Sequence, residues 1–96
     1  MTDETIKKLT RIIDKRNKEL PDNSYVTKLL KNGKVEIANK LGEEAVETIT
    51  AYLAQEKKEI IEESADLVFH LLVLLQSSNL SFEDVLQVLE KRMKND

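Results

Sequence analysis

Two short acidic runs in this sequence repeat a carboxylate at a spacing that suits one face of a helix. They are Glu43-Glu44-x-x-Glu47 and Glu62-Glu63-x-x-Asp66. Residues three positions apart are neighbours on a helix surface, so we expect Glu44 to pair with Glu47 and Glu63 to pair with Asp66. Glu43 lies about 100° from Glu44 around the helix and is expected to face solvent.

The phase of each helix places these pairs beside apolar side chains. On a helical wheel, Glu44 falls close to Ile37, at the inner edge of an apolar arc that we expect to be buried. Glu47 lies further round the helix but leans toward the same edge. In the second run, Glu63 and Asp66 share an arc with His70 that continues into apolar positions. The arc around the first run consists of Ile37, Leu41, Ala45, Ile49 and Tyr52.

Carboxylates placed against an apolar face are costly to ionise alone, and four that converge repel one another and raise each other's pKa. Divalent cations with a preference for oxygen ligands remove this conflict, and Mg²⁺ commonly binds carboxylates together with water and phosphate oxygens. The sequence therefore predicts a Mg²⁺ site, with Mn²⁺ as an alternative, that serves a polyphosphate substrate. Its ligands would be Glu44, Glu47, Glu63 and Asp66. The competing interpretation is that both pairs are solvated on charged helices.

Several other side chains are candidates for contact with the substrate. Lys40 falls between Glu44 and Glu47 on the wheel, where it either offsets their charge or reaches a phosphate. Tyr25 and Ser24 either line a nucleotide pocket or close the helical core. The further phosphate candidates, each of which could instead be a solvated surface cation, are Lys28, Lys31, Lys34 and Arg92. His70 is predicted to be a hydrogen-bonded core residue or, because Asp66 lies one turn before it, to orient that carboxylate.

Local signals divide the chain into helices that must position these groups. Pro21 ends a first helix over residues 4–19, and Ser24 and Gly33 suit the two ends of a short helix over residues 25–32. The alternative for residues 25–32 is an irregular substrate loop. A change of apolar phase breaks the following stretch near residues 54–58, with a fourth helix over residues 58–76. Asn79 suits a left-handed position, and Ser81 opens a capping box before a last helix over residues 82–94, with Val85, Leu86, Leu89 and Met93 inward.

The composition sets the fold class. Ninety-six residues fit one domain, residues 1–96, and two glycines with one proline among 34% charged residues favour an all-α fold of four to five helices.

Residues 67–75 are apolar nearly all round the helix, so we expect a homodimer to cover them. A net charge of −3 without a basic stretch argues against nucleic acid, and the longest apolar run, Leu71 to Leu75, argues against a membrane. We expect a cytoplasmic protein.

Three runs of residues also carry a family resemblance. They are Ser24-Tyr25-Val26-Thr27-Lys28-Leu29-Leu30, Lys40-Leu41-Gly42-Glu43-Glu44-Ala45-Val46-Glu47, and Glu62-Glu63-Ser64-Ala65-Asp66-Leu67-Val68-Phe69-His70-Leu71-Leu72-Val73-Leu74-Leu75. Over almost the whole chain the sequence resembles the phosphoribosyl-ATP pyrophosphatases of histidine biosynthesis, a narrow family among the all-α nucleoside-triphosphate pyrophosphatases of MazG type.

The resemblance implies a MazG-like helical bundle, completed by homodimerisation, that acts on a small-molecule nucleotide. The implied reaction is Mg²⁺-dependent hydrolysis of the α–β phosphoanhydride of 1-(5-phosphoribosyl)-ATP, which yields 1-(5-phosphoribosyl)-AMP and pyrophosphate. It implies that the four paired carboxylates hold the metal, that Lys40 contacts a phosphate and that Glu43 orients water. A carboxylate of the Glu44 and Glu47 pair is the expected water activator. Two other functions stay open: a housecleaning pyrophosphatase for noncanonical nucleoside triphosphates, and a helical dimerisation module without catalysis.

Overall fold

The computed structural model describes residues 2–54 and 56–95, and in these ranges the regular structure is entirely α-helical. The helices are α1 (Thr2–Glu19), α2 (Tyr25–Asn32), α3 (Lys34–Ala54), α4 (Lys57–Ser77) and α5 (Phe82–Met93). The prediction of an all-α fold with up to five helices is thus confirmed. The predicted break after the third helix is also confirmed, although Gln55 within it lies outside the described residues.

Local capping interactions set the helix ends where the sequence placed them. The Oγ of Ser24 accepts a hydrogen bond from the N–H of Thr27 (3.3 Å) at the start of α2, and Gly33 ends that helix with φ of 95°. Asn79 has the expected left-handed conformation, with φ of 59°. The N–H of Ser81 donates to the carboxylate of Asp84 (2.9 Å) at the start of α5. Each of these devices satisfies backbone groups that a helix end leaves open.

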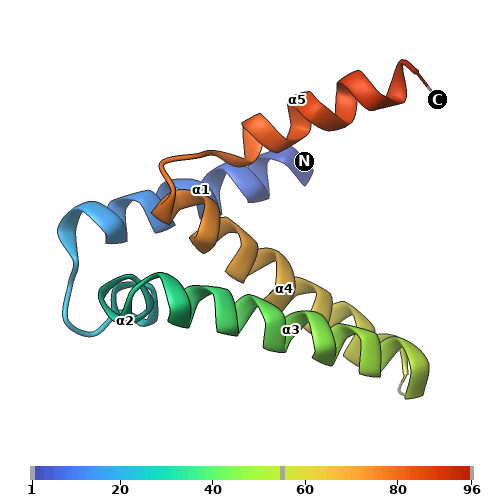
Figure 1. Cartoon of the computed structure of the whole chain (residues 1–96), viewed down its shortest axis with the longest axis horizontal. Helices are drawn as coiled ribbons and strands as arrows, with labels where there is room; N and C mark the ends of the chain where they lie inside the picture. The colour runs from blue at the N-terminus through green and yellow to red at the C-terminus, as the bar shows by residue number, and fades with distance from the viewer. Residues whose placement is uncertain (1, 55, 96) are drawn as a thin grey trace.

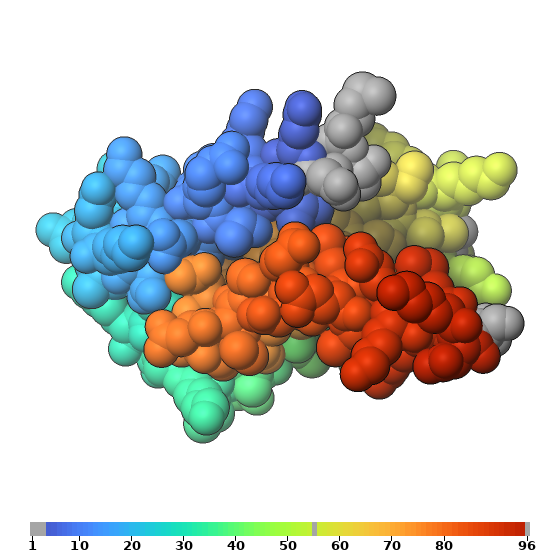
Figure 2. All heavy atoms as spheres, turned by 90° about the horizontal axis from the view of Figure 1, so that it is seen from above, coloured from blue at the N-terminus to red at the C-terminus, as the bar shows by residue number. Residues whose placement is uncertain are grey.

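The long helices α3 and α4 form an antiparallel hairpin and make the most extensive contact between helices (Figure 1). α1 packs against the second half of α4, and α2 closes one end of the bundle by contacting α1, α3 and α4. The core lies where these four helices meet. It consists of Ile13, Val26, Leu29, Ile37, Leu72 and Val73. α5 returns alongside α1 and contributes no fully buried residue (Figure 2).

The buried side of α3 differs from the predicted arc. Ile49 and Tyr52 were expected inside, but they are 56% and 73% exposed. The line that faces α4 instead runs from buried Ile37 through half-buried Glu44 and Thr48 to fully buried Ala51. The reason is that a hairpin covers only a narrow stripe on each helix, with a repeat near 3.5 residues, so the outer part of a wide apolar arc stays uncovered.

Two further expectations about apolar burial are modified by the packing within one chain. Leu72 and Val73 need no partner, because α1, α2 and α3 already reduce their exposure to 3% and 0%, whereas Val68 of the same stretch is 36% exposed. Leu89 and Met93 of α5 were expected inward and are 46% and 69% exposed. The exposed apolar side chains of the hairpin include Val35 near the start of α3 and Val68 on α4. Those on the second half of α3 and the start of α4 are Val46, Ile49, Tyr52, Leu53 and Ile61, which we call the hairpin patch.

Within the described residues no helix is by itself long and apolar enough to cross a membrane. Taken together, the helices Lys57–Ser77 and Phe82–Met93 are long and apolar enough by length and composition, but the chain bends by 108° between them.

Candidate functional site

The structure brings acidic side chains from both helices of the hairpin together. Glu44 of α3 and Glu63 and Asp66 of α4 each offer a carboxylate oxygen, and these oxygens lie within 4.8 Å of one another. Glu47, one turn after Glu44, stays exposed to solvent but lies close enough to raise the pKa of both Glu44 and Glu63. The two predicted pairs therefore face each other across the hairpin, with Glu47 on the solvent side.

Burial makes the ionised form of this cluster costly. It raises the pKa of Glu44 to about 7, and a hydrogen bond with Glu47 and the negative charges of Glu47, Asp66 and Glu63 add to the effect. Burial also raises the pKa of Glu63, followed by the charge of Glu47, a hydrogen bond with Glu47, and the charges of Asp66 and Glu62. One oxygen, Oε2, of Glu44 and of Glu63 is buried with no hydrogen-bond partner among the described residues. Buried oxygens without donors are what a cation would satisfy.

Thr48 couples the two helices directly behind the carboxylates, and the sequence reasoning missed it. Its Oγ1 lies 2.8 Å from the backbone carbonyl oxygen of Glu44 and 3.1 Å from that of Glu63. The single hydroxyl proton is shared between these two acceptors. The sequence did contain a signal, because Thr48 lies four residues after Glu44 on the same helix face. From such a position a threonine hydroxyl commonly donates a hydrogen bond to the backbone carbonyl of the preceding turn.

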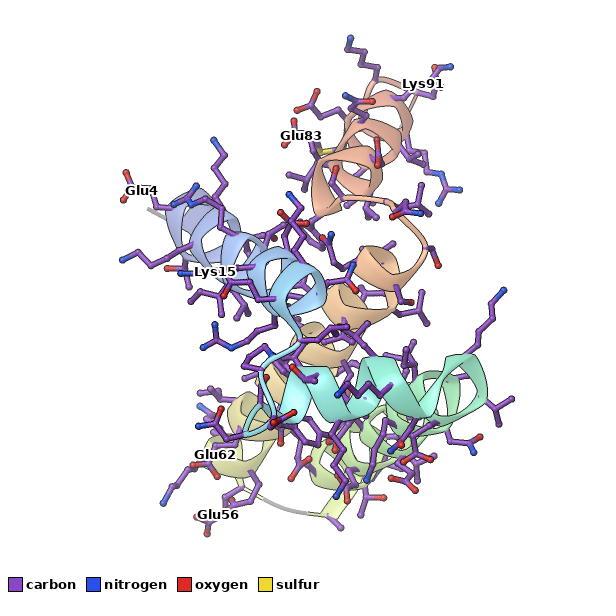
Figure 3. All side chains as sticks on the ribbon, turned by 90° about the vertical axis from the view of Figure 1, so that its left-hand side faces the viewer. Glu4, Lys15, Glu56, Glu62, Glu83 and Lys91 are labelled. Atoms are coloured by element: carbon purple, nitrogen blue, oxygen red, sulfur yellow. The ribbon has the colours of Figure 1, made fainter. Side chains whose placement is uncertain are left out.

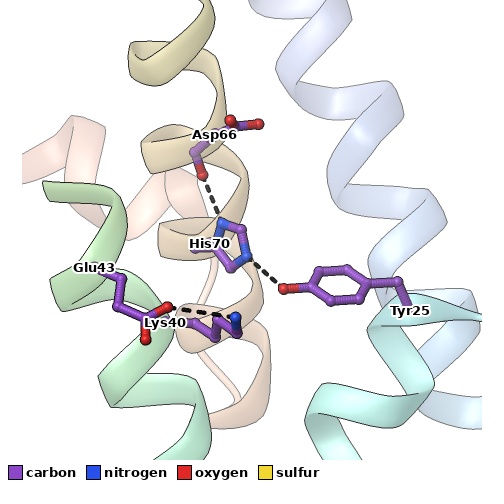
Figure 4. A network of polar contacts seen from close by, with 5 residues as sticks. All are labelled: Tyr25, Lys40, Glu43, Asp66 and His70. Atoms are coloured by element: carbon purple, nitrogen blue, oxygen red, sulfur yellow. Dashed lines mark hydrogen bonds and ion pairs between the residues drawn. The ribbon is translucent and has the colours of Figure 1, made fainter. Parts of the chain in front are cut away.

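His70 and Tyr25 join α4 to α2 beside the acidic cluster (Figure 4). His70 Nδ1 lies 2.7 Å from the backbone carbonyl oxygen of Asp66. A carbonyl oxygen only accepts, so Nδ1 carries a proton, and the tautomer with its single proton there has a lone pair at Nε2. Tyr25 Oη, at 2.9 Å, therefore donates to Nε2. His70 is 6% exposed, which confirms a hydrogen-bonded core histidine, and its bond goes to the backbone of Asp66 rather than to the carboxylate.

Lys40 has a different partner from the expected one. Its Nζ lies 3.3 Å from Glu43, whose side chain is 61% exposed, and this contact raises the pKa of Lys40 (Figure 4). Glu43 thus faces solvent, as the helical phase predicted. Glu62 projects near the end of the hairpin and is also exposed (Figure 3).

With this geometry in place, comparison with known proteins gives the family. The sequence matches the phosphoribosyl-ATP pyrophosphohydrolase family over residues 6–93. The chain belongs to this family. A phosphoribosyl-ATP pyrophosphatase of Zymomonas mobilis is 48% identical over 92 residues, covering 96% of this chain and 86% of that protein. One from Metallosphaera sedula is 44% identical over 94 residues, covering 98% of this chain and all of that protein.

A longer relative also matches. The histidine biosynthesis bifunctional protein HisIE of Thermotoga maritima is 46% identical over 86 residues, which cover 90% of this chain. The chain spans only 44% of the length of that relative.

In this member of the phosphoribosyl-ATP pyrophosphohydrolase family, the other predicted substrate residues fall into three places. Lys34 is the first residue of α3, is exposed, and lines neither of the two hollows that contain the others. Ser24, Tyr25, Lys28 and Lys31 line an open groove of about 420 Å³ along the start of α2, which we call the α2 groove. Arg92 lies on α5 in a separate hollow lined only by residues of the C-terminal segment. A third groove, of about 470 Å³, lies between α1 and α5 and contains none of the predicted site residues.

Proposed function

We propose that this chain hydrolyses the α–β phosphoanhydride of 1-(5-phosphoribosyl)-ATP and releases 1-(5-phosphoribosyl)-AMP and pyrophosphate, a step of histidine biosynthesis. The family and the names of the relatives support the reaction. The structural observation that carries it is the facing carboxylate cluster with two buried, unpartnered oxygens. Such a cluster suits a polyphosphate substrate, because the negative charges of both must be neutralised together.

The residues of the cluster fit a divalent cation, for which we propose Mg²⁺ with Mn²⁺ as an alternative. Glu44, Glu63 and Asp66 would hold it, and Glu47 would complete the site from the solvent side. When bound, Mg²⁺ neutralises nonbridging phosphate oxygens and orients the phosphates for attack.

The side chains of the chain itself supply the proton transfer and the positioning. A carboxylate of the Glu44 and Glu47 pair takes the proton of the attacking water as the water oxygen bonds to phosphorus and the bond to the bridging oxygen breaks. Glu47 is exposed, so water and substrate reach it from solvent. Glu43 orients the water or Lys40, and Lys40 turns from Glu43 to a phosphate when substrate is present, since their ion pair is exposed and weak.

A pyrophosphate-release assay on 1-(5-phosphoribosyl)-ATP, with Mg²⁺ and with EDTA, tests this function. We expect release only with Mg²⁺, and little release from dUTP or dCTP. Preferred turnover of dUTP or dCTP would instead indicate a housecleaning pyrophosphatase. The absence of both turnover and Mg²⁺-dependent stabilisation would indicate a helical dimerisation module.

We further propose that residues 1–96 act as one domain and associate as a homodimer. The hairpin patch leaves five apolar side chains exposed on α3 and the start of α4, and we propose that a second copy covers them. The net charge of −3 and the family's nucleotide substrate argue for a small-molecule partner and against nucleic acid or a membrane. We expect the enzyme to act in the cytoplasm.

A further inference from the structure

The α2 groove is cationic and lies outside the carboxylate cluster. Lys28 and Lys31 line it from one helix face, and both are exposed. The only carboxylate among its lining residues is Asp22, which lies 3.9 Å from Lys31 with a fully exposed side chain. An ion pair of that length and exposure leaves Lys31 free to change partner.

The start of α2 adds hydrogen-bond donors to these charges. The N–H groups of Tyr25 and Val26 belong to the first turn, where helical N–H groups have no acceptor within the helix, and that turn contains no acidic residue. Thr27 also lines the groove; it is only 2% exposed, and its Oγ1 has no hydrogen-bond partner among the described residues. A hydroxyl that is buried and unpartnered beside two lysines indicates a place for an anion.

Tyr25 connects this groove to the carboxylate cluster. Its side chain lines the groove, is 47% exposed, and hydrogen-bonds to His70, which in turn bonds the backbone of Asp66. The Tyr25 ring also stacks on Phe69, with centroids 6.1 Å apart. Tyr25 thus belongs to the cationic groove and is joined through His70 to the helical turn that carries Asp66, and its half-exposed ring offers a surface to a sugar or a base.

The substrate of the proposed function has a matching division of charge. Its triphosphate is attached to one ribose, and a monoester phosphate is attached to a second ribose on the other side of the purine. With the phosphoanhydride at the carboxylate cluster, the monoester phosphate must be held elsewhere. We propose that the α2 groove binds this monoester phosphate through Lys28, Lys31 and the first turn of α2, and thereby distinguishes phosphoribosyl-ATP from nucleotides without it.

The kinetic test compares two substrates and therefore rests on the proposed function. They are 1-(5-phosphoribosyl)-ATP and 1-ribosyl-ATP, which lacks only the monoester phosphate. For the double variant Lys28→Gln/Lys31→Gln we expect kcat/KM on the first substrate to fall about 100-fold, mainly through KM, because two charge-assisted contacts are lost. On 1-ribosyl-ATP we expect a change below about threefold. Lys15→Gln, at an exposed position of α1, is the control and should leave kcat/KM unchanged on both substrates (Figure 3). Equal losses on both substrates, or no loss on either, would overturn the proposal.

A binding measurement tests phosphate binding in the α2 groove without any turnover. It therefore distinguishes failure of this inference from failure of the proposed function. Ribose 5-phosphate is titrated into the metal-free protein, and backbone amide shifts are recorded, with ribose as the control ligand. We expect saturable shifts in residues 24–32 with ribose 5-phosphate only, and their loss in the double lysine variant. Shifts elsewhere only, no shifts, or equal shifts with ribose would each refute phosphate binding in the groove.

Discussion

The hydroxyl of Thr48 lies 3.1 Å from the backbone carbonyl oxygen of Glu63, on the opposite helix of the hairpin, and 2.8 Å from that of Glu44 on its own helix. One side chain thus links the backbone of α3 to the backbone of α4 at the two residues that carry the half-buried carboxylates. We predict that Thr48→Val, which keeps the shape and removes the hydroxyl, lowers the free energy of unfolding by about 1 to 2 kcal/mol. It should also raise the Mg²⁺ concentration needed for half-maximal activity, because the carboxylates are then held less firmly.

Urea unfolding and Mg²⁺ titration of activity measure the two effects. Thr50→Val is the matched control, since Thr50 lies on the same helix but is exposed. A Thr48→Val protein that matches the Thr50→Val protein in both measurements would show that the bridge contributes nothing.

Glu43 and Glu44 are adjacent, and the structure ranks them for the next prediction. Glu44 lies in the cluster with one buried oxygen, whereas Glu43 faces solvent and contacts Lys40. Glu44→Gln should therefore lower kcat at least about tenfold more than Glu43→Gln, with the larger increase in Mg²⁺ requirement, because it removes a charge from direct contact with the cation. Equal or greater damage from Glu43→Gln would move the ligand assignment by one residue.

The helix ends were predictable because each depends on a few neighbouring residues. Ser24, Gly33 and Asn79 act through their own backbone or the next turn, so their positions in the sequence suffice. Which part of a wide apolar arc is covered depends instead on the neighbouring helix, and for this reason Ile49 and Tyr52 were misplaced. Helical phase predicted which carboxylates share a face, and an antiparallel pairing of the two helices brings those faces together. The bond between Tyr25 and His70 did not, since it joins residues 45 positions apart and requires the packing of α2 on α4.

The raised pKa of Glu44 predicts the pH dependence of stability without metal. The pKa is about 7 in the folded chain against 4.5 for the ordinary side chain, so between these values the folded state binds more protons than the unfolded state. The stability contributed by this group is complete below about pH 4.5 and is lost as the pH rises through about 7. In EDTA, the free energy of unfolding of the parent relative to Glu44→Gln should therefore fall from pH 5 to pH 7.5.

Saturating Mg²⁺ at pH 7.5 should recover that loss in the parent and not in Glu44→Gln, because only the parent presents the full set of charges. Urea unfolding at both pH values provides the measurement. A parent that gains stability over Glu44→Gln as the pH rises in EDTA would show that the cluster is not destabilised by its own charge.

The hydrogen bond from Tyr25 to His70 supports a separate prediction. Tyr25→Phe keeps the ring and its stacking on Phe69 but leaves Nε2 of a nearly buried histidine without its donor. We expect a loss of about 1 kcal/mol or more in the free energy of unfolding. Thr5→Val, which removes a hydroxyl from an exposed position of α1 outside the hairpin patch, should change stability by less than about 0.5 kcal/mol. Equal effects in urea unfolding would indicate that the bond does not stabilise the attachment of α2.

The hairpin patch gives the last prediction. Leu72 and Val73 are already buried within one chain, so we expect the dimer interface to use the hairpin patch rather than these two residues. Ile49 is 56% exposed on α3 and Ile61 is 68% exposed on α4. Ile49→Glu and Ile61→Glu should each convert a dimer into a monomer, because a partner surface would have to bury an unpaired charge. Ile12→Glu is the control, since Ile12 is an isoleucine with 43% exposure on α1, outside the patch. Sedimentation at micromolar concentration measures the mass of each variant. A parent that sediments as a monomer would refute the dimer, and a dimer that survives both patch substitutions but dissociates with Ile12→Glu would place the interface on α1 instead.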